Sequence, residues 1–279
     1  MPELPEVEAV RRTLIGTVDG RQIEGVKVLR RDYFRRMAFP AEQLLGHTLR
    51  TIGRHGKRLF WQFDADVCMV SHLGMSGRIT LRMPGDACLP HTHLIIVLAG
   101  GIHLHFSDPR RFGGVWLYNR GTDAVAEHVQ GRMGVDALSL READLITWSQ
   151  KATCLKAELL NQKTVAGLGN IYIDEALWMA QLHPLQSVQR LGPESRARLV
   201  ACIGQVLRAS LDRGGTTLRD YRDAKANRGG FAESLAVYGK AGQPCRRCGT
   251  KLRGLVVAQR STVVCPKCQA RRKRGEHAN

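Results

Sequence analysis

The stretch CRRCGTKLRGLVVAQRSTVVCPKC, residues 245–268, contains two Cys-x2-Cys pairs separated by sixteen residues. Gly249 follows the first pair and Pro266 lies inside the second, so each pair is expected in a tight turn. Paired cysteines at this spacing form two knuckles that close a tetrahedral thiolate site. Because four thiolates leave no open coordination position, we predict one structural Zn2+ ion bound by Cys245, Cys248, Cys265 and Cys268.

The segment between the two pairs carries Arg260, with Gln259, Ser261 and Thr262 beside it. Side chains of these types bind phosphate. A module of about 30 residues has too little apolar surface for a core of its own, so the metal supplies its folding energy. The finger is therefore predicted to hold a phosphate-binding loop. The other cysteines lie among apolar neighbours and are expected to be small buried hydrophobic residues: Cys68, Cys88, Cys154 and Cys202.

The charge of the chain indicates a polyanionic partner. Lysine and arginine number 42 against 25 acidic residues, a formal net charge of +17. Eleven basic residues and no acidic one lie between Lys240 and Arg274. Such an excess repels itself unless a polyanion screens it, and each neutralised phosphate releases counterions. We therefore expect a nucleic acid as the partner.

The sequence shows no run of about 18 uncharged apolar residues of the kind that spans a membrane. Its N-terminus, Met-Pro-Glu-Leu-Pro-Glu, is acidic and lacks the apolar centre of a signal peptide. We expect a cytoplasmic protein with no membrane partner.

The pattern of apolar residues changes near residue 130. Before it, short strands are expected, with the clearest hairpin at residues 94–106 around Gly100-Gly101. One helix precedes them, with Val7, Val10 and Leu14 on one face. After it, the pattern is helical, most clearly over 195–211. The expected domains are 1–130 (β-rich), 131–235 (helical), 236–270 (zinc finger) and 271–279 (a basic tail).

Several separated motifs together resemble the formamidopyrimidine-DNA glycosylases, bacterial enzymes related to the endonuclease VIII glycosylases. The resemblance covers nearly the whole chain, and its motifs keep their order and spacing. They are Pro2-Glu3-Leu4-Pro5-Glu6-Val7-Glu8, Lys57, His72-Leu73-Gly74-Met75-Ser76-Gly77, Asp108-Pro109-Arg110-Arg111-Phe112-Gly113, Val165-Ala166-Gly167-Leu168-Gly169-Asn170-Ile171-Tyr172, Gly214-Gly215-Thr216-Thr217, Val237-Tyr238-Gly239 and the finger with Arg260.

This resemblance implies an α+β fold: an N-terminal β-sandwich domain with a flanking helix, then a helix-two-turn-helix domain with the four-cysteine zinc finger. It implies a bifunctional DNA glycosylase and AP lyase of base excision repair. The expected substrate is double-stranded DNA with a damaged base, an oxidised purine such as 8-oxoguanine or a formamidopyrimidine. The expected enzyme is a monomer, cytoplasmic in a bacterium and associated with the nucleoid.

The resemblance also assigns the chemistry. With Met1 removed, the Pro2 nitrogen attacks the sugar to form a Schiff base, and β,δ-elimination then cuts the strand. A terminal amine has a pKa of about 8, so an appreciable fraction is nucleophilic at neutral pH. Glu3 is implied as the general acid and base. Lys57 is implied as a phosphate and proton-transfer residue near the lesion, and Arg260 as the clamp on the flanking phosphates.

Base extrusion leaves a void in the duplex. The resemblance implies that Met75 fills it, that Phe112 unstacks a base step and that Arg110 pairs with the orphaned cytosine. Judged by residue type alone, Met75 and Phe112 would be core residues. Asn170, His91 and Tyr238 are implied as further DNA contacts, whereas Arg111 is expected to be structural. Three ordinary strand residues are expected at His93, His103 and His105.

The segment Thr216–Phe231 is rich in glycine and charge, and we expect it to close over a flipped purine. The alternative is a solvated linker. The chain departs from the family pattern at Gly254 and Ala152, where relatives place basic residues, and in its long tail from Ala270.

Two other functions stay open. A non-catalytic zinc-ribbon protein that binds nucleic acid explains the charge and the cysteines, but it does not explain Pro2 and Glu3. An endonuclease VIII-type glycosylase for oxidised pyrimidines typically has glycine where this chain has Leu4.

Overall fold

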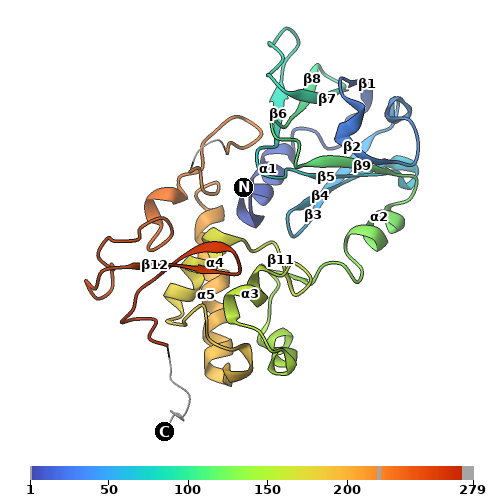
Figure 1. The fold of residues 1–279 in the computed structure, drawn as a ribbon. Coiled ribbons are helices and arrows are strands. Elements are labelled where there is room, and N and C mark those ends of the chain that lie inside the picture. Colours follow the sequence, from blue (N-terminus) through green and yellow to red (C-terminus); the bar gives the residue numbers. More distant parts are fainter. Residues whose placement is uncertain (1, 219–220, 272–279) are drawn as a thin grey trace. The chain divides into compact units, whose positions relative to one another are not determined.

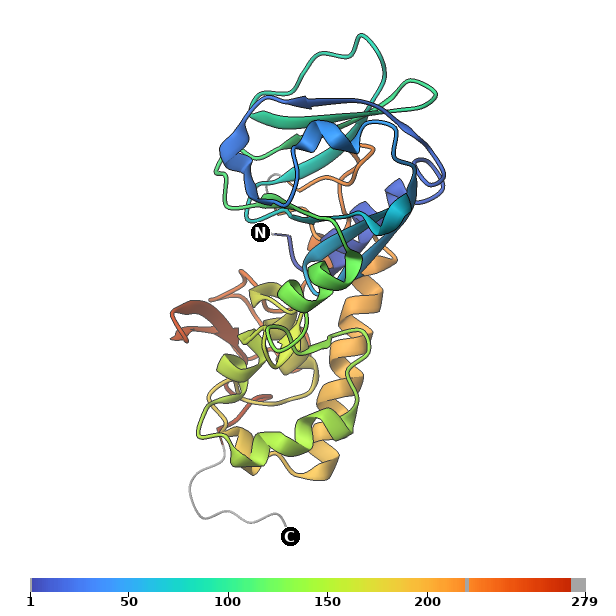
Figure 2. The same ribbon diagram turned by 90° about the vertical axis from the view of Figure 1, so that its right-hand side faces the viewer.

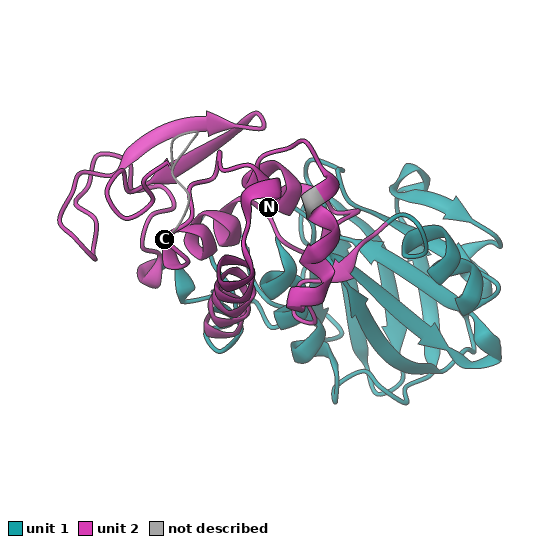
Figure 3. Cartoon of the chain, turned by 90° about the horizontal axis from the view of Figure 1, so that it is seen from below, with its two compact units in different colours: residues 1–132, 210–232 teal, residues 133–209, 233–279 magenta. Residues whose placement is uncertain are grey.

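The computed structural model describes residues 2–218 and 221–271; Met1, Arg219, Asp220 and the tail from residue 272 lie outside the described part. The chain forms two compact units, coloured separately in Figure 3. Unit 1 comprises residues 1–132 and 210–232, and unit 2 comprises residues 133–209 and 233–279. The chain therefore leaves unit 1, returns to it for one segment and leaves it again.

Unit 1 contains two β-sheets, labelled in Figure 1. Neighbouring strands are antiparallel except β2 and β9, which are parallel. The first sheet has the order β1 (Ile23–Val28), β7 (Thr92–Leu98), β8 (Ile102–Ser107) and β6 (Arg78–Arg82). The second has the order β2 (Phe34–Met37), β9 (Gly114–Tyr118), β5 (Cys68–His72), β4 (Arg58–Phe63) and β3 (Leu49–His55).

The predicted hairpin is confirmed as β7 and β8. Leu98 pairs with Ile102 across the turn, where Gly100 and Gly101 have φ values of +84° and +74°. Two consecutive positive φ values match the right-handed twist of the strands, and glycine adopts them without steric cost.

Both sheets contribute side chains to one apolar core, which makes unit 1 the predicted β-sandwich. Ile96 and Leu104 come from the first sheet, and Trp61 and Leu117 come from the second. The flanking helix α1 (Leu4–Leu14) adds Val7, Val10 and Leu14 to the same core. A short helix, α2 (Gly121–His128), follows β9.

Unit 2 is mainly helical. Its helices are α3 (Leu155–Leu160), α4 (Asn170–Met179) and α5 (Pro193–Leu211); α5 is seen along its length in Figure 2. Two short strands, β10 (Val135–Asp136) and β11 (Val165–Ala166), pair in parallel. The finger forms an antiparallel hairpin of β12 (Arg253–Val257) and β13 (Arg260–Val264). Short 3-10 segments in the chain are Arg31–Tyr33, Ala41–Leu44, Asp64–Asp66, Glu142–Gln150, Val188–Arg190 and Phe231–Ser234.

The α+β class is confirmed, but several elements were not expected. Strand β2 has the sequence FRRM, too short and too charged to show a period. Cys68 and Cys202 are buried as predicted. Cys88 is exposed, so its prediction as a buried residue was wrong; it lies in the turn region after β6, where little chain packs over it. Cys154 is half-buried. Within the described residues, no helix is both long and apolar enough to span a membrane.

Candidate functional site

The N-terminal candidates lie at the start of α1. Pro2 is buried, and Glu3, only 2% exposed, is the N-cap residue of the helix. The backbone N–H of Glu3 donates to Glu6 Oε2 over 2.7 Å, which closes a capping box. Pro5 stands in the first turn, where the missing N–H is not needed. Local capping therefore fixes the backbone that carries the Pro2 nitrogen and the Glu3 carboxylate.

Glu6 also binds the segment expected to cap the lesion. Its Oε1 accepts the backbone N–H of Thr216 over 2.8 Å, and its carbonyl accepts the Tyr221 hydroxyl over 3.1 Å. Ala224 is fully buried in the unit 1 core, and its carbonyl accepts the N–H of Leu81. The described part of Thr216–Phe231 is thus folded against α1 and is not a solvated linker.

Lys57 lies in the turn between β3 and β4, after Gly56 with φ +56°. The turn is tied to α1 through Glu8. This carboxylate accepts Arg11 at both oxygens over 2.8 Å and Arg54 Nε over 3.0 Å. Although burial alone raises the pKa of Glu8, these two guanidinium groups lower it to about 2. The turn that carries the half-buried Lys57 is therefore held beside α1, the helix that Pro2 and Glu3 precede.

The three predicted void-filling residues project from two loops of unit 1. Phe112 is 58% exposed and Met75 is 40% exposed, so neither is the core residue that its type suggests. The Arg110 guanidinium lies over the Phe112 ring, 4.7 Å from its centre. His91 is exposed with φ +61°, and its carbonyl accepts the N–H of Asp108.

Other histidines behave as expected for strand residues. His93 lies in β7, is buried and bonds the Asp108 carbonyl over 2.9 Å. The rings of His103 and His105, both on β8, stack 6.2 Å apart.

The four finger cysteines converge in unit 2, with ligand atoms all within 4.8 Å of one another. The sulfurs of Cys248 and Cys265 are 3.4 Å apart, and those of Cys245 and Cys268 are 4.0 Å apart. Tetrahedral zinc with Zn–S bonds of about 2.3 Å places its sulfurs about 3.8 Å apart. The donor set therefore fits zinc. Trp178 Nε1–H donates to Cys245 Sγ over 3.4 Å, an outer hydrogen bond that orients this ligand.

The finger hairpin presents Arg260 immediately after its turn. The two turn residues, Ala258 and Gln259, have φ values of +48° and +59° although neither is glycine. Such a conformation costs on the order of 1 kcal/mol per residue and persists only where the surroundings enforce it. Arg260 itself is exposed.

Helix α4 supplies those surroundings. Asn170 Nδ2 donates to the Ser261 carbonyl over 2.8 Å, and Asp174 Oδ2 accepts the Val263 N–H over 3.1 Å. The Glu175 carboxylate accepts three consecutive backbone N–H groups, at 2.7 to 2.9 Å, from Ala236, Val237 and Tyr238. One helix therefore fixes both the Arg260 hairpin and the Tyr238 loop.

A fully buried lysine completes this network. Lys156 Nζ donates to Asp174 Oδ1 over 2.5 Å, to Thr262 Oγ1 over 2.7 Å and to the Ser261 carbonyl over 3.2 Å. Lys156, Asp174 and Glu175 were not among the residues predicted from the sequence. A signal was present, because the acidic pair interrupts an otherwise apolar helix, IYIDEALWM.

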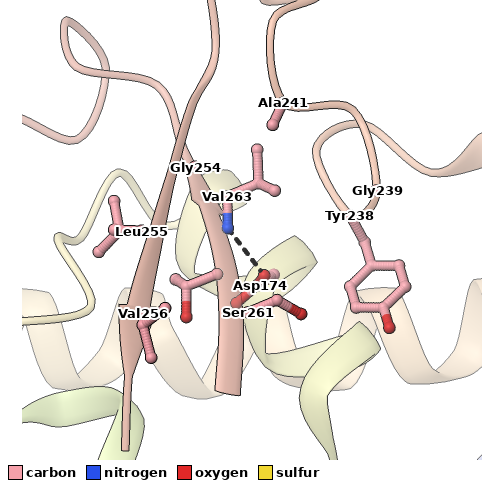
Figure 4. A pocket seen from close by; sticks show the side chains of 10 residues that line it. Asp174, Tyr238, Gly239, Ala241, Gly254, Leu255, Val256, Ser261 and Val263 are labelled. Carbon is pink, nitrogen blue, oxygen red and sulfur yellow. Dashed lines mark hydrogen bonds between the residues drawn. The ribbon is translucent and has the colours of Figure 1, made fainter. Parts of the chain in front are cut away.

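A cavity of about 470 Å3 lies beside this hairpin (Figure 4). Its lining includes Asp174, Tyr238 and Gly254. Figure 4 shows Asp174 bonded to the backbone of Val263 at the edge of this cavity. The predicted site residues thus fall in two groups: Pro2, Glu3, Lys57, Met75, His91, Arg110 and Phe112 in unit 1, and Asn170, Tyr238, Arg260 and the four cysteines in unit 2.

Comparison with known families gives three matches along the chain. Residues 1–115 match the formamidopyrimidine-DNA glycosylase N-terminal domain, and residues 134–222 match the H2TH domain of the same glycosylases. Residues 242–271 match the zinc finger found in FPG and IleRS. The predicted helix-two-turn-helix domain and zinc finger are confirmed.

Individual relatives match over almost their whole length. The formamidopyrimidine-DNA glycosylase of Bacillus subtilis is 40% identical over 278 residues, covering 98% of this chain and all of the relative. That of Cytobacillus firmus is 38% identical over 275 residues, covering 96% of this chain and all of the relative.

Solved structures of Lactococcus lactis Fpg are similar over the same length of chain. A mutant in complex with Fapy-dG-containing DNA has a TM-score of 0.89 at 33% identity, covering 97% of this chain and all of that one. A complex with abasic-site DNA has a TM-score of 0.89 at 32% identity and covers 96% and 100% of the two chains. A complex of the wild-type protein with DNA containing an oxidised pyrimidine has a TM-score of 0.88 at 32% identity, covering 97% and 100%.

Proposed function

This chain belongs to the formamidopyrimidine-DNA glycosylase family, and from that premise we propose that it excises oxidised purines from double-stranded DNA and then cuts the strand. One observation carries the proposal: Pro2 and Glu3 stand together, buried, at a capped helix start that Glu6 joins to the capping segment. A zinc-ribbon protein that only binds nucleic acid has no need of this arrangement.

The chemistry follows from a secondary amine. The Pro2 nitrogen bonds to C1′ as the bond from C1′ to the base breaks, and Glu3 moves the protons needed to open the sugar. A secondary amine can form only a cationic iminium. This cation accepts electrons when the C2′ proton leaves, so the 3′ phosphate is expelled, and a second elimination expels the 5′ phosphate. A one-nucleotide gap remains.

The flanking phosphates need cations in fixed positions. We assign this role to Lys57 in unit 1 and to Arg260 in unit 2. The strained turn before Arg260, supported by α4, supports this role because strain is retained where geometry matters. The N-terminus of α4 at Asn170 offers backbone N–H groups to a phosphate. His91 and Tyr238 are assigned further backbone contacts.

In this proposal Met75 fills the void left by the extruded base, Phe112 unstacks a base step and Arg110 reads the orphaned cytosine. Their exposure supports this role, since a large apolar side chain left in water loses the stabilisation of burial. The capping segment Thr216–Phe231 covers the flipped purine; Arg219 and Asp220 within it lie outside the described residues.

The chain binds one structural zinc ion through Cys245, Cys248, Cys265 and Cys268. We further propose that it acts as a cytoplasmic monomer near the bacterial nucleoid. The domain limits 1–130, 131–235, 236–270 and 271–279 stay a prediction. Unit 1 as a compact body also includes residues 210–232.

Borohydride trapping tests the nucleophile. Reduction of the iminium should cross-link the protein to lesion DNA, and peptide mapping should place the adduct on residue 2. A protein that retains Met1 behind an N-terminal tag should give no cross-link, because its Pro2 nitrogen is an amide. Glu3→Gln should bind the lesion but barely excise it. An adduct on Lys57 would overturn the assignment.

The same assay tests the substrate. We expect 8-oxoguanine opposite cytosine to be removed faster than thymine glycol in one duplex context. The opposite order would favour the endonuclease VIII-type alternative. The comparison includes a pyrimidine lesion because the Lactococcus lactis relative was solved with DNA that contains an oxidised pyrimidine. Arg222→Ala probes the capping segment, because Arg222 is exposed whereas Ala224 belongs to the core.

A further inference from the structure

The void-filling residues are carried by two loops that are packed together in unit 1. One loop follows β5 and carries Met75, and the other follows β8 and carries Arg110 and Phe112. Their backbones touch: a Cβ built on Gly74 would lie 2.3 Å from Gly113 N, and Gly74 has φ +59°. Only glycine fits there, so the two loops form a single structural piece.

A buried carboxylate joins the loops. Asp108 is completely buried, and its Oδ1 accepts the Ser76 hydroxyl over 2.6 Å and the Arg110 N–H over 3.3 Å. Its Oδ2 accepts the Gly113 N–H over 2.8 Å. The Arg110 N–H is shared with Ser76 Oγ at 3.2 Å. The Asp108 carboxylate therefore collects donors from both loops.

The Arg35 guanidinium group donates hydrogen bonds to the carbonyls of the same turn. Arg35, on β2, donates through Nη2 to the Arg111 carbonyl over 2.6 Å, and through Nη2 and Nε to the Gly113 carbonyl over 2.9 and 3.2 Å. A fourth bond goes to the Asp32 carbonyl over 3.3 Å. The Arg111 side chain adds an ion pair with Asp32 at 2.7 Å.

These bonds hold a strained conformation. Arg111 has φ +53°, which costs a non-glycine residue on the order of 1 kcal/mol. With N–H groups bound to Asp108 and carbonyls bound to Arg35, the turn cannot relax without breaking charge-assisted bonds at both sides. The loops are thus fixed in the free protein, with Arg110 already stacked on Phe112.

We propose that Asp108 and Arg35 are positioning residues that set Met75, Arg110 and Phe112 in their void-filling arrangement before DNA binds. The proposal rests on the proposed function, since it presupposes base extrusion. Because the two loops are already ordered in the free protein, DNA binding does not have to supply the entropy cost of ordering them. Loss of either residue should therefore slow base extrusion and weaken recognition of the orphaned base.

Arg35→Ala is the decisive variant, because Arg35 is exposed and its removal leaves no cavity in the core. Arg36→Ala is its matched control. Arg36 is the next residue of the same strand, is also exposed, and binds Glu127 and the Tyr118 ring instead of the loops. Both variants lose one positive charge, so nonspecific affinity for DNA should fall equally.

Single-turnover excision of 8-oxoguanine should be measured opposite cytosine and opposite adenine, with 2-aminopurine beside the lesion to report extrusion. Loss of the Arg35 hydrogen bonds to the Arg111 and Gly113 carbonyls in Arg35→Ala should slow extrusion and excision opposite cytosine about tenfold and reduce the cytosine-to-adenine ratio. Arg36→Ala should stay within about twofold of the wild type. Arg35→Lys should not restore the ratio, since the ammonium on its flexible stem lacks the rigid planar fork through which Arg35 holds both carbonyls.

Equal rates and equal ratios for Arg35→Ala and Arg36→Ala would reject the positioning role. That failure is distinct from failure of the proposed function, in which the wild type would not excise 8-oxoguanine at all. Asp108→Asn gives a second measurement, because its amide cannot accept the Gly113 N–H while an oxygen remains for Ser76. It should lower the same ratio; an unchanged ratio in a folded protein counts against Asp108.

Discussion

Unit 1 builds its polar contacts on a large apolar core, whereas unit 2 depends on a metal and a buried polar network beside a small apolar cluster. Pro2 and Glu3 precede a helix whose Val7, Val10 and Leu14 enter the large sandwich core. Arg260 stands on a hairpin whose own apolar cluster has, among the described residues, six buried members: Ala236, Val237, Cys245, Leu252, Val263 and Cys265.

The difference matters because the two kinds of support fail differently. An apolar core loses stability in proportion to the contacts removed. A buried charge network stabilises only when every member is satisfied, and removal of one partner leaves an uncompensated charge. A single substitution should therefore destabilise the finger more than it destabilises the sandwich core, and loss of the finger should be measurable while unit 1 stays folded.

Removal of a zinc ligand should have the largest effect. Structural zinc supplies about 10–16 kcal/mol of folding free energy in such fingers. Cys248→Ala should lose zinc, DNA binding and cleavage together, while hydrogen exchange in α1 and the two sheets stays unchanged. Metal analysis measures the zinc content, and hydrogen-exchange mass spectrometry measures the protection of α1 and the two sheets in the same protein.

Two controls sharpen this result. Cys88→Ala removes an exposed cysteine outside the finger and should keep zinc and activity. Arg260→Ala should keep zinc but lose cleavage, and its slope of log affinity against log salt should fall by about one unit. Loss of protection throughout unit 1 in Cys248→Ala would mean that the two supports are not independent.

Disruption of the buried pair should have an intermediate effect. Lys156→Ala leaves Asp174 buried without its partner, a change that typically costs about 3–5 kcal/mol. We expect faster zinc loss to a chelator and weaker protection of β12 and β13. The double variant Lys156→Met with Asp174→Leu, which removes both charges, should recover part of the loss. Lys151→Ala, at a half-exposed lysine bound to Glu158, is the control.

Acid should have the smallest effect and should act on unit 1. Burial, followed by the charges of Arg58 and Lys57, lowers the pKa of His72 to about 4; burial and Arg58 do the same for His128. Both pKa values lie below the ordinary value of 6.5, so unfolding takes up protons between pH 6.5 and 4. This stability is fully present above pH 6.5 and is lost as the pH falls towards 4.

Between pH 7 and pH 5 the loss should be roughly 3 kcal/mol for the two histidines together. Hydrogen exchange of β4, β5 and α2 measures it, and His128→Gln should reduce the dependence by about half. His103→Gln is the control, because His103 lies on β8 in the other sheet. Measurements above pH 5 exclude Glu8, whose lowered pKa affects stability only between 4.5 and about 2. A pH-independent unit 1 would contradict the lowered pKa values of both rings.

The sequence predicts local features and misses those that depend on distant partners. The finger follows from cysteine spacing and the β7–β8 hairpin from alternation around Gly100-Gly101, because both signals lie within one short segment. Lys156 and Arg35 carry no such signal. In the sequence each looks like an ordinary basic residue. Only the fold brings Lys156 to Asp174 and Thr262, and Arg35 to the Arg111 carbonyl.

The capping segment shows the same limit. Its glycines and charges are typical of a loop, but nothing in them predicts that Ala224 enters the sandwich core or that Thr216 bonds Glu6, 210 residues earlier. The predicted roles of Pro2, Glu3 and Lys57 came from resemblance to a family, and the structure adds the supports around them.

The path of the chain constrains how this protein is made. Unit 1 includes residues 210–232, so it is not complete when residue 132 leaves the ribosome. Its core lacks Ala224, and Glu6 lacks Thr216, until most of unit 2 has been synthesised. Domains generally fold in order during synthesis, but here unit 1 is completed only after residues 133–209 of unit 2 have been synthesised. A chain truncated after residue 132 would expose the apolar surface that this segment covers, so the two units cannot be produced separately by one cut.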